Sequence, residues 1–266
     1  MSATKEAKYL TVPALERVPG LVHGFGTRSL DLAALRRLAA RSGCRVVQLD
    51  QVHSAEIIVV GGGGPGLSPG VEFRRTRPRL ISAGEYARIP RKGSRRPKGD
   101  ALVTDRSGLL LAVRTADCLP AFIVDPEKRV CAAVHAGWRG TRSRIMERAV
   151  DVLVSRFGCR PRSLLAAFGP CIGAACYEVG LDVRGEFAAA GLALSVFRPS
   201  PRRSGAFLLD LAAANRRQLL GRGLAARRIF PSPSCTRCDA RLFSFRRDRD
   251  ATARLYNFIG FRSADV

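Results

Sequence analysis

The sequence predicts a globular α/β protein, and two observations support that prediction. Three short apolar runs, LLLAV at 109–113, AFIV at 121–124 and VCAAV at 130–134, are bounded by polar or proline-containing turns. Runs of this kind are typical of strands buried on both faces. Segments with helical periodicity alternate with such runs through the 266 residues, 46% of which are hydrophobic. A chain of this length can bury a sizeable core, so we expect one domain over 1–266.

The N-terminal part is expected to contain two strands, a helix and then two more strands. A strand and turn at 9–19 lead to a second apolar run that ends in HGFGTR. Asp31 is the predicted N-cap of a helix that ends near Arg41. Residues 46–60 divide into two β-rich pieces around the tripeptide Gln-Val-His at 51–53.

A glycine-rich and then arginine-rich stretch interrupts this pattern. We predict a long surface insertion at 61–99, and a lid over an active site is one role for it. It opens with GGGGPG, which is not a phosphate-binding loop because no Lys-Ser/Thr pair or helix follows.

The C-terminal half continues the alternation. Thr141 is the predicted N-cap of a helix from Arg142 to Phe157. Further strands are expected at 164–168, 195–198, 206–210, 228–232, 242–248 and 252–261, and helices at 181–190 and from Leu211, with Asp210 as cap.

Composition indicates which binding partners and which cellular compartment to expect for this protein. The net charge is +23, mostly from arginine, which fits compositional bias or phosphate-bearing ligands. A nucleic-acid partner is disfavoured because aromatic and basic residues do not interleave. No apolar run reaches the roughly 18 residues of a membrane span, and the N-terminus lacks a signal core, so we expect a cytoplasmic protein. The eight cysteines are then thiols, with Cys44 and Cys131 in the core.

Two of the three histidines end strong β runs, and a cysteine lies between them in the sequence. His53, Cys118 and His135 would supply three protein ligands and leave one position for water, which is the arrangement of a catalytic zinc site. The rival interpretation is a nucleophilic Cys118 activated by His135, with Asp117 or His53 as orienting group. The CTRC motif at 235–238 has no second pair, so it is weak support for a structural zinc.

The GWRGT segment after His135 is a candidate anion pocket. Its backbone amides precede a predicted helix, and Arg139 adds a guanidinium fork for phosphate or carboxylate. The alternative is a tight turn that packs Trp138, and both roles are compatible.

Six motifs together resemble one known family. QVHS, GDALVTD, TADCLP, AAVHAGWRG, FGPCIGAACYEVG and LFSFRRD are similar, in order, to the motifs of YfiH-type proteins. That family is also called polyphenol oxidoreductase (laccase-like) or peptidoglycan editing factor. The resemblance runs from about 23–28 to the C-terminus and leaves out the insertion. It implies a compact mixed-sheet sandwich with flanking helices, similar to the cysteine-dependent deamidase domain of a bacterial toxin, a cysteine-hydrolase-like fold.

The resemblance also implies a site and an activity. The family's metal ligands, usually for zinc, fall on His53, Cys118 and His135, with copper as a possible substitute. The implied reactions are phosphorolysis of adenosine, inosine, guanosine and methylthioadenosine, and deamination of adenosine, which makes purine nucleosides and phosphate the expected partners. Independently of the resemblance, we expect a monomer. The candidate phosphate-binding residues are Arg28, Arg139, Arg246 and Arg247, and the candidate proton shuttles are Glu178 and Asp117. The spellings HGFGTR and TARL depart from the family and leave contacts near Arg28 and Arg254 open.

Three other functions remain as alternatives. Copper-dependent oxidation of phenols would suit two histidines and a cysteine at one copper, but three histidines are too few for a multicopper cluster. A hydrolase with Cys118 as nucleophile would edit a peptidoglycan precursor without metal. A nucleic-acid-binding protein would show steep salt dependence.

Overall fold

The apolar runs at the centre of the sequence form strands of two packed sheets. The computed structural model describes residues 7–61, 79–81 and 96–263. Its central strands are β7 (Leu109–Thr115), β8 (Leu119–Asp125) and β9 (Val130–Ala136), close to the predicted positions. Every residue of β8 and β9 is buried, because helices cover one face of their sheet and a second sheet covers the other.

Both large sheets mix parallel and antiparallel pairs. A five-stranded sheet has the order β1-β2-β15-β7-β3, and a seven-stranded sheet has the order β14-β10-β8-β9-β6-β4-β5. In the first sheet β3 runs parallel to β7, whereas β15 is antiparallel to its neighbours β2 and β7. The other strands are β1 (Tyr9–Leu10), β2 (Leu21–Gly26), β3 (Arg45–Gln48), β4 (Ile57–Val60), β5 (Arg79–Ile81), β6 (Ala101–Thr104), β10 (Leu165–Phe168), β14 (Ile229–Phe230) and β15 (Leu255–Phe261).

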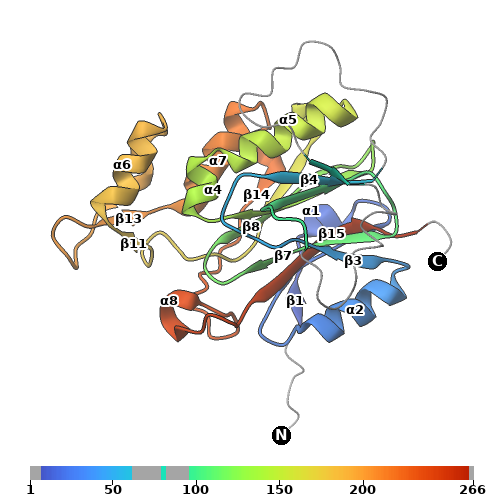
Figure 1. The fold of residues 1–266 in the computed structure, drawn as a ribbon, viewed down its shortest axis with the longest axis horizontal. Coiled ribbons are helices and arrows are strands. Elements are labelled where there is room, and N and C mark those ends of the chain that lie inside the picture. The colour runs from blue at the N-terminus through green and yellow to red at the C-terminus, as the bar shows by residue number, and fades with distance from the viewer. Residues whose placement is uncertain (1–6, 62–78, 82–95, 264–266) are drawn as a thin grey trace, which may run out of the picture.

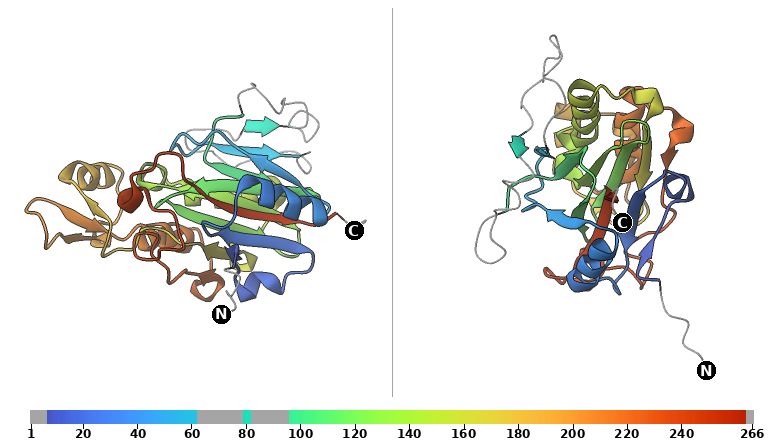
Figure 2. Two further views of the ribbon diagram at one scale, coloured as in Figure 1. Left: turned by 90° about the horizontal axis from the view of Figure 1, so that it is seen from below. Right: turned by 90° about the vertical axis from the view of Figure 1, so that its right-hand side faces the viewer.

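Helices lie on the outer faces of the two sheets (Figure 1 and Figure 2). Helices α5 (Ile145–Phe157) and α7 (Leu211–Gly221) pack on the seven-stranded sheet, and α2 (Leu32–Arg41) packs on the five-stranded sheet. Between the sheets, Phe25 stacks on Phe122 with ring centroids 4.4 Å apart. The expected α/β sandwich with flanking helices is confirmed. None of the helices in the described ranges is long and apolar enough to cross a bilayer.

The chain passes between the two sheets twice at the same end of the sandwich. Residues 49–56 lead from β3 in the five-stranded sheet to β4 in the seven-stranded sheet. Residues 116–118 lead from β7 to β8 in the same direction. Strand β9 ends beside them, since its residue His135 pairs with Pro120 at the start of β8. Both crossings and the C-terminal end of β9 therefore lie around one position.

A smaller set of elements extends beyond this end of the sheets (Figure 1). It contains a three-stranded sheet of order β11-β13-β12 and helix α6. The bounds are β11 (Glu178–Val179), α6 (Leu181–Ala189), β12 (Phe197–Pro199) and β13 (Phe207–Leu209). The remaining short elements are helices α1 (Pro13–Glu16), α4 (Trp138–Arg142) and α8 (Phe245–Asp248) and 3₁₀ turns at Pro161–Ser163, Leu194–Val196 and Ala226–Arg228.

Two predicted helix starts are confirmed by their caps. The Asp31 carboxylate accepts a hydrogen bond from the amide of Ala34, and Asp210 does the same for Ala213. These bonds satisfy amides that the first helical turn leaves without a partner.

The predicted helix from Arg142 to Phe157 is wrong at its beginning. The helical segment starts earlier, with Gly137 as N-cap of α4, and a break follows in which Arg144 adopts a left-handed φ of 62°. Thr141 is not an N-cap, because its hydroxyl lies inside α4 and donates to the carbonyl of Gly137.

Two further predictions differ from the structure or fall outside it. The predicted strand at 242–248 is wrong: its second half is α8, a single helical turn in which the Ser244 hydroxyl caps the Arg247 amide. Most of the predicted insertion at 61–99 lies outside the described residues. Within it, 79–81 form β5, which pairs in parallel with β4.

Candidate functional site

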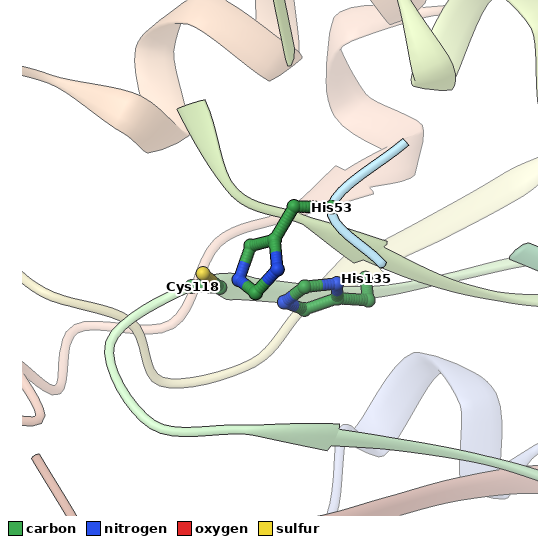
Figure 3. Close-up of side chains that lie close together, drawn as sticks. All are labelled: His53, Cys118 and His135. Atoms are coloured by element: carbon green, nitrogen blue, oxygen red, sulfur yellow. The ribbon is translucent and has the colours of Figure 1, made fainter. Parts of the chain in front are cut away.

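Three side chains from distant parts of the sequence converge where the chain crosses between the sheets (Figure 3). His53 lies on the β3–β4 crossing, Cys118 immediately precedes β8, and His135 is the penultimate residue of β9. One ligand atom from each lies within 4.8 Å of the other two. The imidazole centroids of His53 and His135 are 5.0 Å apart. Two imidazoles and a thiolate so arranged form a donor set that suits zinc or copper.

Asp100 holds two of these three residues in place. Its carboxylate is fully buried and lies 2.8 Å from Nδ1 of His135, which leaves Nε2 of that ring for the site. The same carboxylate accepts hydrogen bonds from the backbone amides of Val52, His53 and Ser54. One side chain therefore orients the His135 ring and the loop that carries His53.

Cys118 and His135 shift each other's ionisation. Burial raises the pKa of the Cys118 thiol, but the His135 imidazolium and hydrogen bonds from both imidazoles outweigh burial and hold the pKa at about 6. Burial lowers the pKa of His135, but the Cys118 thiolate and the bond to Asp100 raise it to about 9. Between these values the pair is a thiolate beside an imidazolium.

The backbone around the site adopts conformations that most residues avoid. His53 has a φ of 58° and Asp117 a φ of 83°, both in the left-handed region. At Gly137 a Cβ atom would lie 2.9 Å from Sγ of Cys118 and 3.3 Å from Cδ2 of His53. Only glycine therefore lets the chain pass this close to both side chains.

The three side chains lie in the wall of a cavity of about 600 Å³. This volume is within the range of roughly 300–1,000 Å³ that holds small organic ligands. Aromatic side chains and four arginines also line it. Its lining includes Gln51, Arg114, Asp117, Trp138, Arg139, Tyr177, Phe245, Arg246 and Arg254.

Arginine gives the cavity a strongly positive wall. The Arg139 guanidinium stacks on Trp138 at 4.4 Å, and Nη1 of Arg246 donates to the carbonyl of Glu178. Nε of Arg114 is buried without a hydrogen-bond partner among the described residues. Burial, Arg96 and Arg254 lower the pKa of Arg114. Positively charged guanidinium groups that line a cavity favour an anionic ligand.

The structure brings only some of the predicted substrate residues to the cavity. Arg139 and Arg246 line it, and so does Arg254. Arg28 instead binds Asp248 and the carbonyl of Leu242. Arg247 donates to the carbonyls of Thr236, Arg237, Asp239 and Leu242 and pairs with Asp248. Neither Arg28 nor Arg247 lines the cavity.

The structure also shows what the predicted proton shuttles and orienting groups contact. Glu178 does not line the cavity and instead binds Ser200 and Arg203. Asp117 lines it, but both oxygens are engaged, one by the Thr236 hydroxyl and one by the Arg246 amide. Asp117 therefore fixes loops, and the group that orients His135 is Asp100.

Sequence reasoning missed four residues of the site: Asp100, Gln51, Arg114 and Tyr177. Gln51 exchanges two 2.8 Å hydrogen bonds with the backbone of Arg114, which ties the β3–β4 crossing to β7. A charged residue immediately before the apolar run ALVT was the available signal for Asp100. Arg114 and Tyr177 carried none beyond their nearness to motif residues.

Known proteins resemble this chain along most of its length. The family model described as multi-copper polyphenol oxidoreductase laccase matches residues 31–262. A Streptomyces coelicolor protein named purine nucleoside phosphorylase SCO2081 is 34% identical over 232 residues, which cover 86% of this chain and 81% of that protein.

Two other relatives match shorter stretches of the sequence, and one solved structure superposes on nearly the whole chain. A Deinococcus radiodurans purine nucleoside phosphorylase is 45% identical over 163 residues, so the match spans 61% of this chain and 61% of that relative. A protein named adenosine deaminase RL5, from an unknown prokaryote, is 40% identical over 149 residues, 56% of each chain. The crystal structure of YlmD from Geobacillus stearothermophilus superposes with a TM-score of 0.78 at 29% identity over 98% of both chains.

The predicted resemblance is thereby confirmed by a family match over most of the chain and by structural neighbours named YlmD and YfiH. This chain belongs to the multi-copper polyphenol oxidoreductase laccase family, the family of the YfiH-type proteins.

Proposed function

We propose that this chain is a metal-dependent purine nucleoside enzyme that performs phosphorolysis and deaminates adenosine. The observation that carries the proposal is the convergence of His53, Cys118 and His135 in the wall of an arginine-lined cavity. Relatives named purine nucleoside phosphorylase and adenosine deaminase support the substrate class.

The same three side chains are the proposed metal ligands and zinc the proposed metal. Nε2 of His135 is available because Asp100 engages Nδ1, and the depressed pKa of Cys118 favours the thiolate that a metal requires. The chemistry that zinc supplies when bound is Lewis-acid activation of water or of a substrate oxygen. The residues around it bind the substrate and exclude solvent.

Phosphate is proposed to bind against the arginine wall. Arg139 presents its guanidinium on the face of Trp138, and Arg114 has a buried Nε with no partner among the described residues. Both line the cavity together with Cys118. Guanidinium groups fixed in this way hold phosphate oxygens and offset the charge that develops on the leaving base and attacking phosphate.

Aromatic side chains supply surfaces for the base. Phe245 lines the cavity with 45% of its surface exposed, which leaves a ring face free for stacking. Tyr177 lies nearby, and its pKa is raised by burial and by the Cys118 thiolate. Its hydroxyl therefore keeps its proton at neutral pH and can donate a hydrogen bond to a purine nitrogen.

A multicopper oxidase is the weaker candidate, despite the family description. Its trinuclear chemistry needs many imidazoles, and the chain has three histidines. The third, His23, accepts a hydrogen bond from the Val12 amide and does not line the cavity. Copper bound at the three-residue site would then be a single substituted ion.

A metal-free hydrolase with Cys118 as nucleophile is the second candidate. The Cys118 thiolate interacts with the His135 imidazolium, which in turn is oriented by the Asp100 carboxylate. It predicts that chelation leaves activity intact while Cys118→Ser abolishes it. The metal-dependent enzyme instead loses activity with either treatment.

The deciding experiment assays inosine and adenosine with and without phosphate. We expect phosphate-dependent release of hypoxanthine from inosine and release of ammonia from adenosine. His53→Gln should abolish both and lower the zinc content, whereas His23→Gln, which keeps an acceptor for the Val12 amide, should change neither. Absence of both products in zinc-loaded protein would refute the proposal.

The arginine wall has its own test. Arg139→Gln should raise KM for phosphate at least tenfold, because a charge-assisted contact is worth about 1.5–3 kcal/mol. Arg37→Gln, at an exposed position on α2, is the matched control. An unchanged KM in Arg139→Gln would remove that residue from the phosphate site.

A further inference from the structure

A second cluster of thiols lies outside the cavity and plays no part in the proposed reaction. Cys176 comes from the loop before β11, and Cys235 and Cys238 are the two ends of the CTRC motif. Their sulfur atoms all lie within 4.8 Å of one another. From these positions we infer that Cys176, Cys235 and Cys238 bind a second zinc ion, which clamps the CTRC loop to the loop whose residues Ile172 and Tyr177 line the cavity.

The spacing of the sulfur atoms fits a tetrahedral zinc site. With Zn–S bonds of about 2.3 Å, two thiolates of a tetrahedral site lie about 3.8 Å apart. The Sγ atoms of Cys176 and Cys238 are 3.4 Å apart, and Sγ of Cys235 lies within 4.8 Å of both. Small rotations of the side chains therefore suffice to bind the ion. All three cysteines are free thiols.

Backbone hydrogen bonds shape the Cys-x-x-Cys motif around Cys235. The amides of Cys238 and Asp239 both donate to the carbonyl of Cys235, which folds the motif into a tight turn. The amide of Gly173 donates to Sγ of Cys235 at 3.1 Å. At Gly173 a Cβ atom would lie 3.3 Å from that sulfur, so a glycine allows the close approach.

Amide hydrogen bonds to sulfur stabilise a thiolate. The Gly173 amide that donates to Sγ of Cys235 acts in this way. Three thiolates and one zinc ion carry a net charge of −1, in a chain whose net charge is +23. Soft thiolate ligands select zinc over the harder cations.

Exposure differs among the three cysteines in a way that leaves one side of the site open. Cys176 and Cys235 are half-buried, whereas Cys238 is exposed. A metal ion therefore reaches the site from solvent, and water supplies the fourth ligand.

The location of the cluster explains what the ion would stabilise. The two loops already touch, because Cys171 and Cys235 form a β-bridge and the Thr236 amide donates to the Cys171 carbonyl. Thr236, inside the motif, binds Asp117 through its hydroxyl at 2.6 Å, and Asp117 precedes Cys118. Tyr177, which lines the cavity, follows Cys176. A clamp here positions the cavity wall without contacting substrate.

Zinc analysis of four proteins tests the inference. We expect about two zinc ions per chain in the wild type, about one in Cys238→Ser, about one in Cys118→Ser and about two in Cys44→Ser. Cys44 is the control because its buried thiol belongs to neither cluster and contacts the carbonyls of Ser42 and Phe261, which a serine hydroxyl can also bind. Cys238→Ser changes an exposed side chain, so its circular dichroism spectrum should match that of the wild type.

Cobalt substitution gives an independent readout. The thiolate-to-cobalt absorption in the near ultraviolet should fall more in Cys238→Ser than in Cys118→Ser, because the second cluster holds three thiolates and the first holds one. The midpoint of thermal unfolding should rise with added zinc in Cys118→Ser and stay constant in the double variant Cys118→Ser/Cys238→Ser.

Two results would overturn the inference. One is equal zinc content in the wild type and Cys238→Ser. The other is a disulfide between Cys176 and Cys238 in protein purified with zinc, detected as the loss of two titratable thiols. Loss of zinc in Cys238→Ser but not in Cys118→Ser would instead support the second site and refute the metal centre of the proposed function.

Discussion

Replacing Asp100 with asparagine tests the geometry of the candidate site most directly. One oxygen of the carboxylate binds the His135 ring and the His53 amide, and the other binds the amides of Val52 and Ser54 and the Ser54 hydroxyl. All of these groups donate hydrogen bonds. Asparagine keeps one acceptor oxygen but turns an NH₂ group toward the donors on the other side, so either the His135 ring and His53 amide or the Val52 and Ser54 donors lose their acceptor.

The expected losses follow from these contacts. Removing a carboxylate that orients a metal-binding histidine typically weakens metal affinity about 10- to 100-fold, which equals about 1.4–2.7 kcal/mol. Breaking a buried, hydrogen-bonded pair costs about 3–5 kcal/mol of unfolding free energy. We expect Asp100→Asn to be near the lower end, about 3 kcal/mol, because one acceptor remains.

Two assays separate the two effects. Competition with a chromophoric chelator gives zinc affinity, and urea unfolding of the metal-free protein gives stability. The control is Asp125→Asn, at another buried carboxylate, which accepts from the amides of Glu127 and Lys128 at the far end of β8. It should lower stability and leave zinc affinity unchanged. Zinc affinity within twofold of wild type in Asp100→Asn would refute the orienting role.

Three further predictions follow from single contacts. Gly137→Ala should lower zinc affinity at least tenfold, measured by chelator competition, because its methyl group would approach Cys118 Sγ and His53 to 2.9 and 3.3 Å; an unchanged affinity would contradict the close approach. In metal-free protein, the rate of Cys118 alkylation by iodoacetamide should fall as pH drops through about 6, since the pKa of the folded thiol is depressed and the thiolate is the reactive form; a midpoint near 9 would exclude the ion pair, and added zinc should protect the thiol. Asp210→Ala should cost about 1 kcal/mol of unfolding free energy by urea titration, through loss of the Ala213 cap, and a change in KM would be inconsistent with a purely structural cap.

The strands were predictable because their pattern is local. LLLAV, AFIV and VCAAV are apolar throughout, and a strand covered on both faces needs no alternation of polar residues. The capping roles of Asp31 and Asp210 were also predictable from the sequence, since a cap bonds to an amide only three residues away.

The failures have local causes of a different kind. Arg144 adopts a left-handed conformation that splits the predicted helix. Arginine has no special preference for that conformation, so the sequence does not predict the break. The LFSF segment alternates like a strand, but no neighbouring strand pairs with it in the described structure, and Ser244 caps a helical turn instead.

The site itself was predictable only in part, because its parts meet through tertiary structure. The nearness of His53, Cys118 and His135 was expected from strand ends and from family motifs. The role of Asp100 depends on the register of β6 against β9, in which Ala101 lies opposite Val134. No sequence spacing encodes that register. Arg28 and Arg247 looked like ligand residues but bind carbonyl groups and Asp248 instead.

The two crossings between the sheets have a consequence for the order of folding and metal binding. His53 and Cys118 take up their positions only when β4 and β8, the strands that follow the two crossings, have paired in the seven-stranded sheet. His135 joins them only when β9 pairs with β8 in the observed register. A half-docked intermediate would thus hold the donor atoms apart and capture no ion. Uptake of metal during refolding would therefore report the moment at which the two sheets close on each other, and a substitution at the Phe25–Phe122 stack between the sheets would delay it.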